Sequence, residues 1–281
     1  GVGDVDLEPE TNSETMPSIK QEAVTYDNVD KLRDLDYLRS HFYTVDPRTA
    51  LTAEDFDVDT LLSQNLMIDN TVEGPKVLIF HTHSGEMYSD SNTDDPMDGV
   101  MGVGAKLASL LTNVYNIETI QHTGRYDVVN GKSRIQGAYE RMEPEVEQIL
   151  RDYPSIQVAL DLHRDGVAAD RRLVTTINGQ SIAQVMFFNG LCKVNRNGEL
   201  TEYSLKNPYI PVNLALSLSA QLTANSLYPN FTRKIYLNAY RYSLNMLPKS
   251  MLLEVGAQTN TKEEALNAMD PLAYVLAQVL L

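Results

Sequence analysis

From residue 76 onward, short apolar runs alternate with longer stretches of helical periodicity, and this alternation limits the folds that the chain can adopt. Four of the runs are typical of buried strands: “KVLIF” (76–80), “YNIETIQ” (115–121), “SIQVALDLH” (155–163) and “KSMLLEVG” (249–256). The remaining patterns predict helices at 102–114, 133–153 and 207–229 and a closing amphipathic helix. Strands that alternate with helices favour an α/β fold, a mainly parallel sheet with flanking helices.

Local signals add detail to this pattern. Pro144 predicts a kink or break in the helix at 133–153, because proline lacks the backbone N–H of a helix interior. The turn-type sequence “NGQS” (178–181) predicts that the runs on either side of it pair as strands. Thr261 and Glu264 have the spacing of a capping box, so we expect the closing helix to begin there.

The first 60 residues differ from the rest in charge. They carry 15 acidic and 5 basic groups and so contribute most of the net charge of −15. We expect residues 1–40 to be an acidic linker or arm and residues 41–281 to form the main domain. The acidic balance argues against nucleic acid or an anionic membrane surface as a main partner. Because the chain begins with Gly1 rather than methionine, we expect that an upstream segment has been removed.

Three of the apolar runs lead into side chains that bind metals. The first is followed by His81, His83 and Glu86, the third contains Asp161-Leu162-His163-Arg164-Asp165, and the last contains Glu254. In open α/β sheets the carboxyl ends of parallel strands share one edge, so we expect these groups to meet there. Cys192 is the only cysteine, which excludes a cysteine-type zinc cluster and an intrachain disulfide.

Histidine and carboxylate ligands with one open position are typical of catalytic zinc, which polarises a carbonyl and acidifies its bound water. A separate carboxylate would take the proton of that water and pass it to the leaving amine. Glu254 suits this role because it lies on a different strand from the proposed ligands. His81 and His83 share a face if the strand stays extended. If the chain turns after Phe80, only one need point inward; we favour His83 and keep His81 as an orienting group or alternate ligand. The alternative is that these are ordinary hydrogen-bonded side chains at strand ends.

Three segments resemble one known family. “VLIFHTHSGEMY” (77–88), “ALDLHRDG” (159–166) and “PKSMLLEVGAQTNTKEEA” (248–265) are similar to the motifs of the stage II sporulation protein P family, cell-wall hydrolases of endospore-forming Firmicutes. “NPYIPVNLALSLSAQL” (207–222) and “LYPNFTRKIY” (227–236) also resemble that family. The resemblance covers roughly residues 40–281, with several motifs in the same order.

The resemblance implies a zinc-dependent N-acetylmuramoyl-L-alanine amidase, whose fold is similar to that of the zinc amidases of bacterial cell separation. On this sequence it places His83, Glu86 and His163 on Zn²⁺ and makes Glu254 the catalytic carboxylate, within a catalytic domain at 41–281. In the cell-separation amidases the ligand glutamate lies further from the first histidine, so Asp95 and Asp98 stand as alternatives to Glu86. The resemblance also implies a possible second activity of the family, an endopeptidase that cuts stem-peptide cross-links.

Other candidates lie beside the motifs. Arg164 would steady a tetrahedral oxyanion or clamp a substrate carboxylate; the alternative is a structural ion pair with Asp165 or Asp161. Tyr126, Asp127 and Arg134 are candidates for substrate contact, and the alternative is an ordinary exposed hairpin. His122 departs from the family pattern, in which a His-Asp pair is expected at this point.

The resemblance also implies partners and a location. The family acts on peptidoglycan outside the cytoplasmic membrane, is tethered by an N-terminal transmembrane helix, and works with a lytic transglycosylase during engulfment. We therefore expect a native protein that is extracytoplasmic and membrane-anchored. Two other functions stay open: a zinc peptidase or deacetylase acting on another amide, and an inactive wall-binding module.

Overall fold

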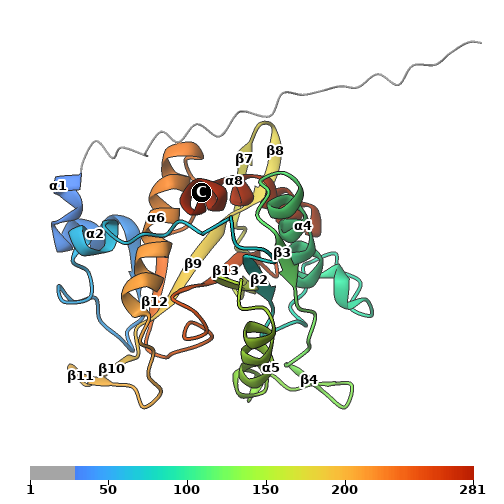
Figure 1. Ribbon diagram of the computed structural model, residues 1–281, viewed down its shortest axis with the longest axis horizontal. Helices are drawn as coiled ribbons and strands as arrows, with labels where there is room; N and C mark the ends of the chain where they lie inside the picture. The colour runs from blue at the N-terminus through green and yellow to red at the C-terminus, as the bar shows by residue number, and fades with distance from the viewer. Residues whose placement is uncertain (1–28) are drawn as a thin grey trace, which may run out of the picture.

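Figure 1 shows the computed structural model, which describes residues 29–281 and is built around a seven-stranded sheet. The strand order is β1-β12-β9-β13-β6-β2-β3. In that order the strands are Tyr43–Val45, Ile235–Asn238, Val185–Gly190, Lys249–Ala257, Val158–Asp165, Val77–Phe80 and Thr119–Gln121. All neighbours run parallel except β9 and β13. The carboxyl ends of β13, β6, β2 and β3 therefore share one edge, and the predicted α/β fold with a mainly parallel sheet is confirmed.

Helices and small hairpins complete the domain. The helices are α1 (Val29–Leu32), α2 (Leu35–Phe42), α3 (Val58–Leu62), the 3₁₀ turn η1 (Pro96–Asp98), α4 (Val100–Asn113), α5 (Ala138–Asp152), α6 (Ile210–Leu227), α7 (Lys262–Asn267) and α8 (Met269–Leu280). The hairpins are β4–β5 (Val128–Val129, Lys132–Ser133), β7–β8 (Val174–Ile177, Gln180–Ala183) and β10–β11 (Lys193–Arg196, Glu199–Glu202). No helix within residues 29–281 is long and apolar enough to cross a membrane.

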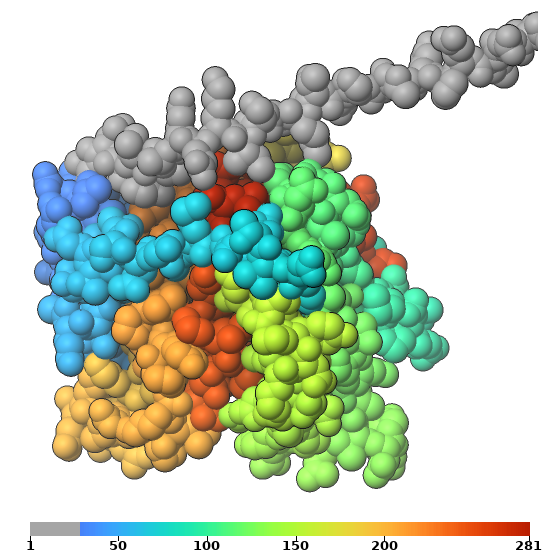
Figure 2. Space-filling view, in the orientation of Figure 1, coloured from blue at the N-terminus to red at the C-terminus, as the bar shows by residue number. Residues whose placement is uncertain are grey.

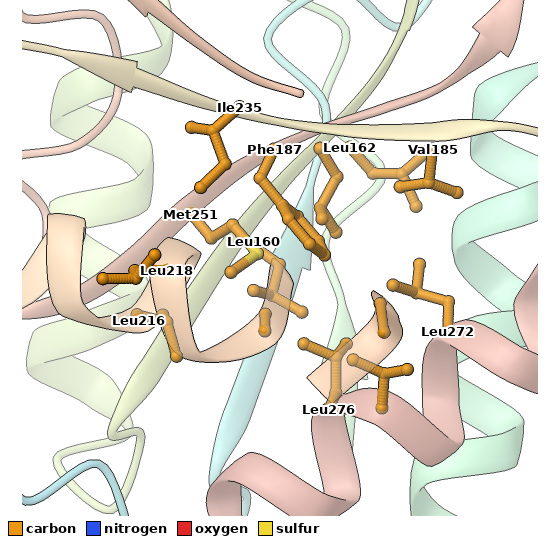
Figure 3. Packing of buried hydrophobic residues seen from close by; sticks show 14 of the residues in the cluster. Leu160, Leu162, Val185, Phe187, Leu216, Leu218, Ile235, Met251, Leu272 and Leu276 are labelled. Atoms are coloured by element: carbon orange, nitrogen blue, oxygen red, sulfur yellow. The ribbon is translucent and has the colours of Figure 1, made fainter. Parts of the chain in front are cut away.

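The larger part of the core lies on one face of the sheet. Side chains alternate between the two faces along a strand, so Leu160 and Leu162 of β6 point the same way, together with Phe187 of β9. Figure 3 shows them packed against Leu216 of α6 and Leu272 of α8. This face is completed by α4, whose apolar residues belong to the same cluster.

The opposite face carries α5 and the functional groups. Leu78 and Phe80 of β2 pack with Met142 and Val146 of α5 in a second cluster. By the same alternation, Asp161 and His163 leave β6 on this face, as Glu254 leaves β13. The α5 face is therefore where the polar strand ends collect.

Several predicted elements differ in detail. The helix expected at 133–153 begins only at Ala138, and it continues through Pro144 without a break. The lost hydrogen bond is offset because Ala138, Met142 and Val146 bury one face of the helix against the sheet. The closing segment is two helices, and the predicted capping box at Thr261 and Glu264 is confirmed. A hairpin does turn within 178–181, but the partner of β7 is Gln180–Ala183, and the run expected to pair with it, 183–188, forms most of β9 in the main sheet.

The expected division at residue 40 falls inside α2, between Leu35 and Phe42. Leu38 on this helix is fully buried and belongs to the main core cluster. Asp34 caps the helix by accepting hydrogen bonds from the backbone N–H groups of Asp36 and Tyr37. Residues 29–40 are thus packed on the domain, whereas residues 1–28 of the expected arm lie outside the described part of the chain.

Candidate metal centre

The turn after β2 separates the two neighbouring histidines. The strand ends at Phe80 and a turn occupies residues 82–85. Asp161 accepts hydrogen bonds from both the backbone N–H and the hydroxyl of Thr82, at 2.9 and 2.7 Å. Asp127 does the same for the Ser84 hydroxyl and the Gly85 N–H, at 2.7 and 2.8 Å. Two buried carboxylates therefore hold the turn from which His83 extends.

His83, Glu86 and His163 come together at this turn. One ligand atom of each lies within 4.8 Å of the others. Glu86 Oε1 lies 3.5 Å from His83 Nδ1, and Glu86 Oε2 lies 3.4 Å from His163 Nδ1. A tetrahedral zinc with bonds of about 2.1 Å holds neighbouring donor atoms about 3.4 Å apart. Two imidazoles and one carboxylate at this spacing fit Zn²⁺ with one position left for water or substrate.

Asp161 lies behind one of these ligands. Its Oδ1 is 2.8 Å from His163 Nε2, which leaves Nδ1 of the ring directed at Glu86. Burial alone would lower the pKa of His163, but the carboxylates of Asp161 and Glu86 raise it well above its usual value. Burial likewise works to raise the pKa of Glu86, and the neighbouring His163 outweighs it, so the net shift is downward. The cluster is therefore strongly polar inside a buried site.

Asp161 is not expected from the sequence motifs to face Nε2 of His163. The available signal was its position two residues before His163 on a strand, which puts both side chains on one face. Residue spacing shows that the two are neighbours. It does not show which ring nitrogen faces the carboxylate, because that depends on the position of the β2 turn.

Glu254 stands beside the cluster on the adjacent strand. In the β13–β6 ladder it is the direct partner of His163, so the two side chains leave the same face next to each other. Its Oε2 atom is buried, and no group in residues 29–281 forms a hydrogen bond with it. Burial raises the pKa of this carboxyl, with His163 opposing and the nearby Glu86 reinforcing the shift. A buried carboxyl of this kind is suited to exchange a proton near neutral pH.

The structure places His81 away from the metal-type cluster. Its ring is fully buried, with Nδ1 2.8 Å from the Leu162 carbonyl and Nε2 2.9 Å from the amide nitrogen of Gln121. That amide also donates to the Met101 carbonyl, so it presents N–H to His81. Both ring nitrogens are occupied in a neutral imidazole, and no lone pair is left for a metal. Burial accordingly lowers the pKa of His81 to about 4.

Arg164 forms neither of the ion pairs considered above. Its backbone N–H donates to Glu86 Oε2 at 2.9 Å, and its Nε donates to the Met87 carbonyl at 2.8 Å. The Asp165 carboxylate instead pairs with Arg233 at 2.7 Å. Arg164 lines a polar hollow of about 540 Å³ that also contains His83 and Glu86.

The three candidates after β3 have different surroundings. Tyr126 is buried, and its hydroxyl lies 2.5 Å from His122 Nε2. Asp127 is also buried and holds the β2 turn, as described above. Arg134 is exposed, and its backbone is tied to Asp127 and Arg141. The structure thus gives Tyr126 and Asp127 internal contacts, and only the side chain of Arg134 is free to meet a ligand.

The alternatives to Glu86 are engaged elsewhere. Asp95 caps the 3₁₀ turn η1 by accepting from the Met97 N–H. Asp98 forms a bidentate ion pair with Lys262 at 2.7 and 2.8 Å. Within the described residues, only Glu86 shares the metal-type cluster with the two histidines.

These features define an α/β domain with a His–Glu–His candidate metal centre and a buried carboxyl at the ends of its central strands. The chain belongs to the stage II sporulation protein P family, whose sequence model matches residues 6–277.

Individual relatives are more distant. Stage II sporulation protein P of Bacillus subtilis (strain 168) is 24% identical over 217 residues, which cover 72% of this chain and 50% of the relative. The chain thus spans about half the length of the curated relative that it matches.

Two solved structures are similar to this chain at low identity. An N-acetylmuramoyl-L-alanine amidase from Clostridium difficile 630 is 13% identical at a TM-score of 0.41, covering 74% of this chain and 95% of that one. The catalytic domain of an amidase of the same kind from Bacillus (Paenibacillus) polymyxa is 12% identical at a TM-score of 0.38, covering 73% and 95%. Both TM-scores lie below 0.5, and the site described above rests on its own geometry.

Proposed function

We propose that this chain is a zinc-dependent hydrolase that cleaves the amide between N-acetylmuramic acid and L-alanine in peptidoglycan, during sporulation-linked wall remodelling. The observation that carries the proposal is the cluster of His83, Glu86 and His163 with Glu254 buried beside it. Membership of a sporulation protein family supports the biological setting. The resemblance of the motifs to a family of wall amidases supports the choice of bond.

The proposed zinc ligands, the proposed base and Arg164 have different roles in the reaction. When bound by His83, Glu86 and His163, Zn²⁺ would supply a Lewis acid for the amide carbonyl and would acidify a water. Glu254 is placed next to His163 to take the proton of the attacking water and to return it to the leaving amine. Arg164, at the edge of the polar hollow, is placed to hold a carboxylate or a developing oxyanion of the substrate.

The test is the activity of a Glu254→Gln variant on purified peptidoglycan. This change keeps the shape of the side chain but removes its proton exchange, so we expect release of stem peptides to fall by about 10²–10⁴-fold. Zinc content, measured by elemental analysis, should stay at the wild-type level because the proposed ligands are untouched. Glu73→Gln is the matched control, since Glu73 is exposed and outside the site.

The reaction products distinguish an amidase from the alternative activities. Free stem peptides and intact glycan strands support the amidase, whereas peptide fragments cut at the cross-links would identify an endopeptidase. Wild-type turnover by Glu254→Gln would contradict the assignment of the base, and absence of zinc from the wild-type protein would contradict a zinc enzyme.

We further propose an extracytoplasmic location, with a membrane anchor upstream of this chain and a lytic transglycosylase as partner. Family membership supports this proposal. A combined digestion tests the partnership: a lytic transglycosylase should increase the rate of peptide release by this chain. Equal rates with and without it would argue against a functional link. Fractionation of cells that produce the full-length protein tests the location, and recovery in the cytoplasm would contradict it.

A further inference from the structure

A row of aromatic rings leads from the candidate metal centre to the surface. The ring of His83 lies 5.6 Å from that of Tyr139, which lies 5.8 Å from that of Tyr242. Tyr242 is followed by Tyr240 at 6.2 Å, and Tyr240 by Tyr203 at 5.1 Å. All four tyrosines are half-buried, and the guanidinium of Arg48 lies over the Tyr240 ring, 5.7 Å from its centroid.

These rings line one hollow of about 370 Å³, which we call the tyrosine groove. Four segments that are distant in the sequence form it: the turn after β2, the start of α5 with the residues before it, the chain just after β11, and the chain between β12 and β13. In Figure 2 the yellow-green surface of α5 and the gold surface of the β10–β11 hairpin stand on either side of the darker orange segment that follows β12. The groove begins at His83, so it is continuous with the proposed site.

Two further observations indicate that the groove receives a ligand. Ile135 and Leu205 line it and are 63% and 46% exposed, which leaves large apolar side chains open at its edge. Arg241 within the groove is bonded to both carboxylate oxygens of Glu143, at 2.9 and 2.8 Å, so this pair is neutralised. Glu140 also lines the groove and is exposed, and the rest of the lining is aromatic, apolar, uncharged or ion-paired, which suits a neutral ring with apolar C–H faces.

The position of Glu254, the proposed base, indicates which part of the substrate would lie in the tyrosine groove. Glu254 lines a different hollow, of about 490 Å³, together with Arg171 and Arg233. A base that returns its proton to the leaving amine places the peptide on its own side of the amide. The acyl group and the sugar attached to it then extend away from that hollow. His83 lines both the polar hollow that contains Arg164 and the tyrosine groove, and the aromatic lining of the groove suits the sugar.

We infer that the tyrosine groove binds an N-acetylated hexosamine ring on the acyl side of the scissile amide, by stacking on its tyrosine rings. This inference rests on the proposed function, because it takes its substrate from there. On this inference Tyr203, at the outer end of the row, binds the sugar and takes no part in hydrolysis of the amide.

The test is the binding of a peptide-free glycan oligosaccharide to the whole chain, measured by calorimetry. Stacking needs the ring of Tyr203 but not its hydroxyl. We expect Tyr203→Ala to weaken binding by about tenfold and Tyr203→Phe to bind within about twofold of wild type. Leu205→Ser, at an exposed position, should also weaken binding and does not disturb the core. Tyr153→Ala is the control, because Tyr153 is an exposed tyrosine outside the groove. Thermal unfolding checks that each variant is folded.

Three results would overturn the inference: no oligosaccharide binding by the wild type, equal binding by Tyr203→Ala, or loss of stem-peptide binding in place of sugar binding. Failure of the proposed function gives a different result. A wild-type chain that binds the oligosaccharide but cleaves no amide would overturn that function and leave the sugar site standing. If the chain is active, Tyr203→Ala should raise KM for glycan-linked peptides, leave kcat unchanged, and leave turnover of a sugar-free lactoyl-peptide unaffected.

Discussion

At the scale of single residues, the buried His81 and the candidate ligand His163 have opposite surroundings. His81 is enclosed between the Leu162 carbonyl and the Gln121 amide, which together favour the neutral ring. His163 is enclosed between two carboxylates, and its neighbour in space, His83, shares one of them. The partners of each ring, and not the residue type, decide which histidine is available to a metal.

Asp161 should control the affinity of the site without binding the metal itself. Its carboxylate lies 2.8 Å from His163 Nε2, on the side of the ring away from Glu86, and removal of a carboxylate behind a ligand histidine typically weakens metal binding by about 10–100-fold. We expect this loss in Asp161→Asn, measured by competition with a zinc chelator. Asp152→Asn, at the exposed end of α5, serves as control. Unchanged zinc affinity in Asp161→Asn would show that the ring is held by other contacts.

His81 should make stability depend on pH. Its pKa is lowered from 6.5 to about 4 by burial, so between these values the unfolded chain binds the proton and the folded chain does not. Its contribution is complete above pH 6.5, declines as the pH falls, and is lost below pH 4, a total of about 3 kcal/mol.

The free energy of unfolding, measured between pH 7 and pH 4 for wild type and His81→Asn, isolates this contribution from that of the carboxylates. The asparagine amide can still donate to Leu162, but it does not titrate. We expect a shallower pH dependence in the variant, and identical slopes would refute the assignment.

At the scale of elements, the site depends on the two-residue alternation of β6 and β13. Leu160 and Leu162 point into the core, while Asp161 and His163 point to the α5 face. The parallel register then sets Glu254 beside His163. A shift of one residue in either strand would move the functional groups into the core, so burial of the leucines also positions the site.

Gly190 should be required where β9 meets the tyrosine groove. A Cβ at this position would lie 2.0 Å from the backbone oxygen of Tyr240 and 2.8 Å from the ring of Tyr242. Because the backbone at Tyr240 would have to move, we expect Gly190→Ala to lower the free energy of unfolding by about 1–3 kcal/mol. Gly166→Ala is the control, since nothing lies within 4 Å of its added Cβ. Denaturant unfolding measures both, and equal stabilities would show that the Tyr240 segment yields easily.

At the scale of the whole molecule, the segment before the sheet is part of the same folded unit. Leu38 of α2 is fully buried in the cluster that also contains the sheet and α6. We expect Leu38→Ala to lower the unfolding free energy by about 2–5 kcal/mol. Arg39→Ala, on the exposed side of the helix, should change it by less than about 1 kcal/mol. A negligible effect of Leu38→Ala on the cooperative unfolding transition would mean that α2 is only loosely attached.

The sequence by itself determined the class of fold and the segments that carry the chemistry. Apolar runs alternating with helical periodicity predict a mainly parallel sheet, and parallel strands bring their carboxyl ends to one edge. His83, Glu86, His163 and Glu254 could therefore be expected to meet, because the first two follow a strand and the other two lie toward the carboxyl ends of theirs. These inferences need only local patterns and the geometry of strands.

Tertiary structure alone decided the details of contact. The carboxylates that hold the β2 turn lie 43 and 79 residues away along the chain, so no local pattern shows that His83 joins the metal-type cluster and His81 does not. The same holds for the tyrosine groove, whose rings come from α5, the chain after β11 and the chain after β12. The reason is physical: strand type and helix type follow from neighbours in sequence, whereas the orientation of a ring or a carboxylate follows from its neighbours in space.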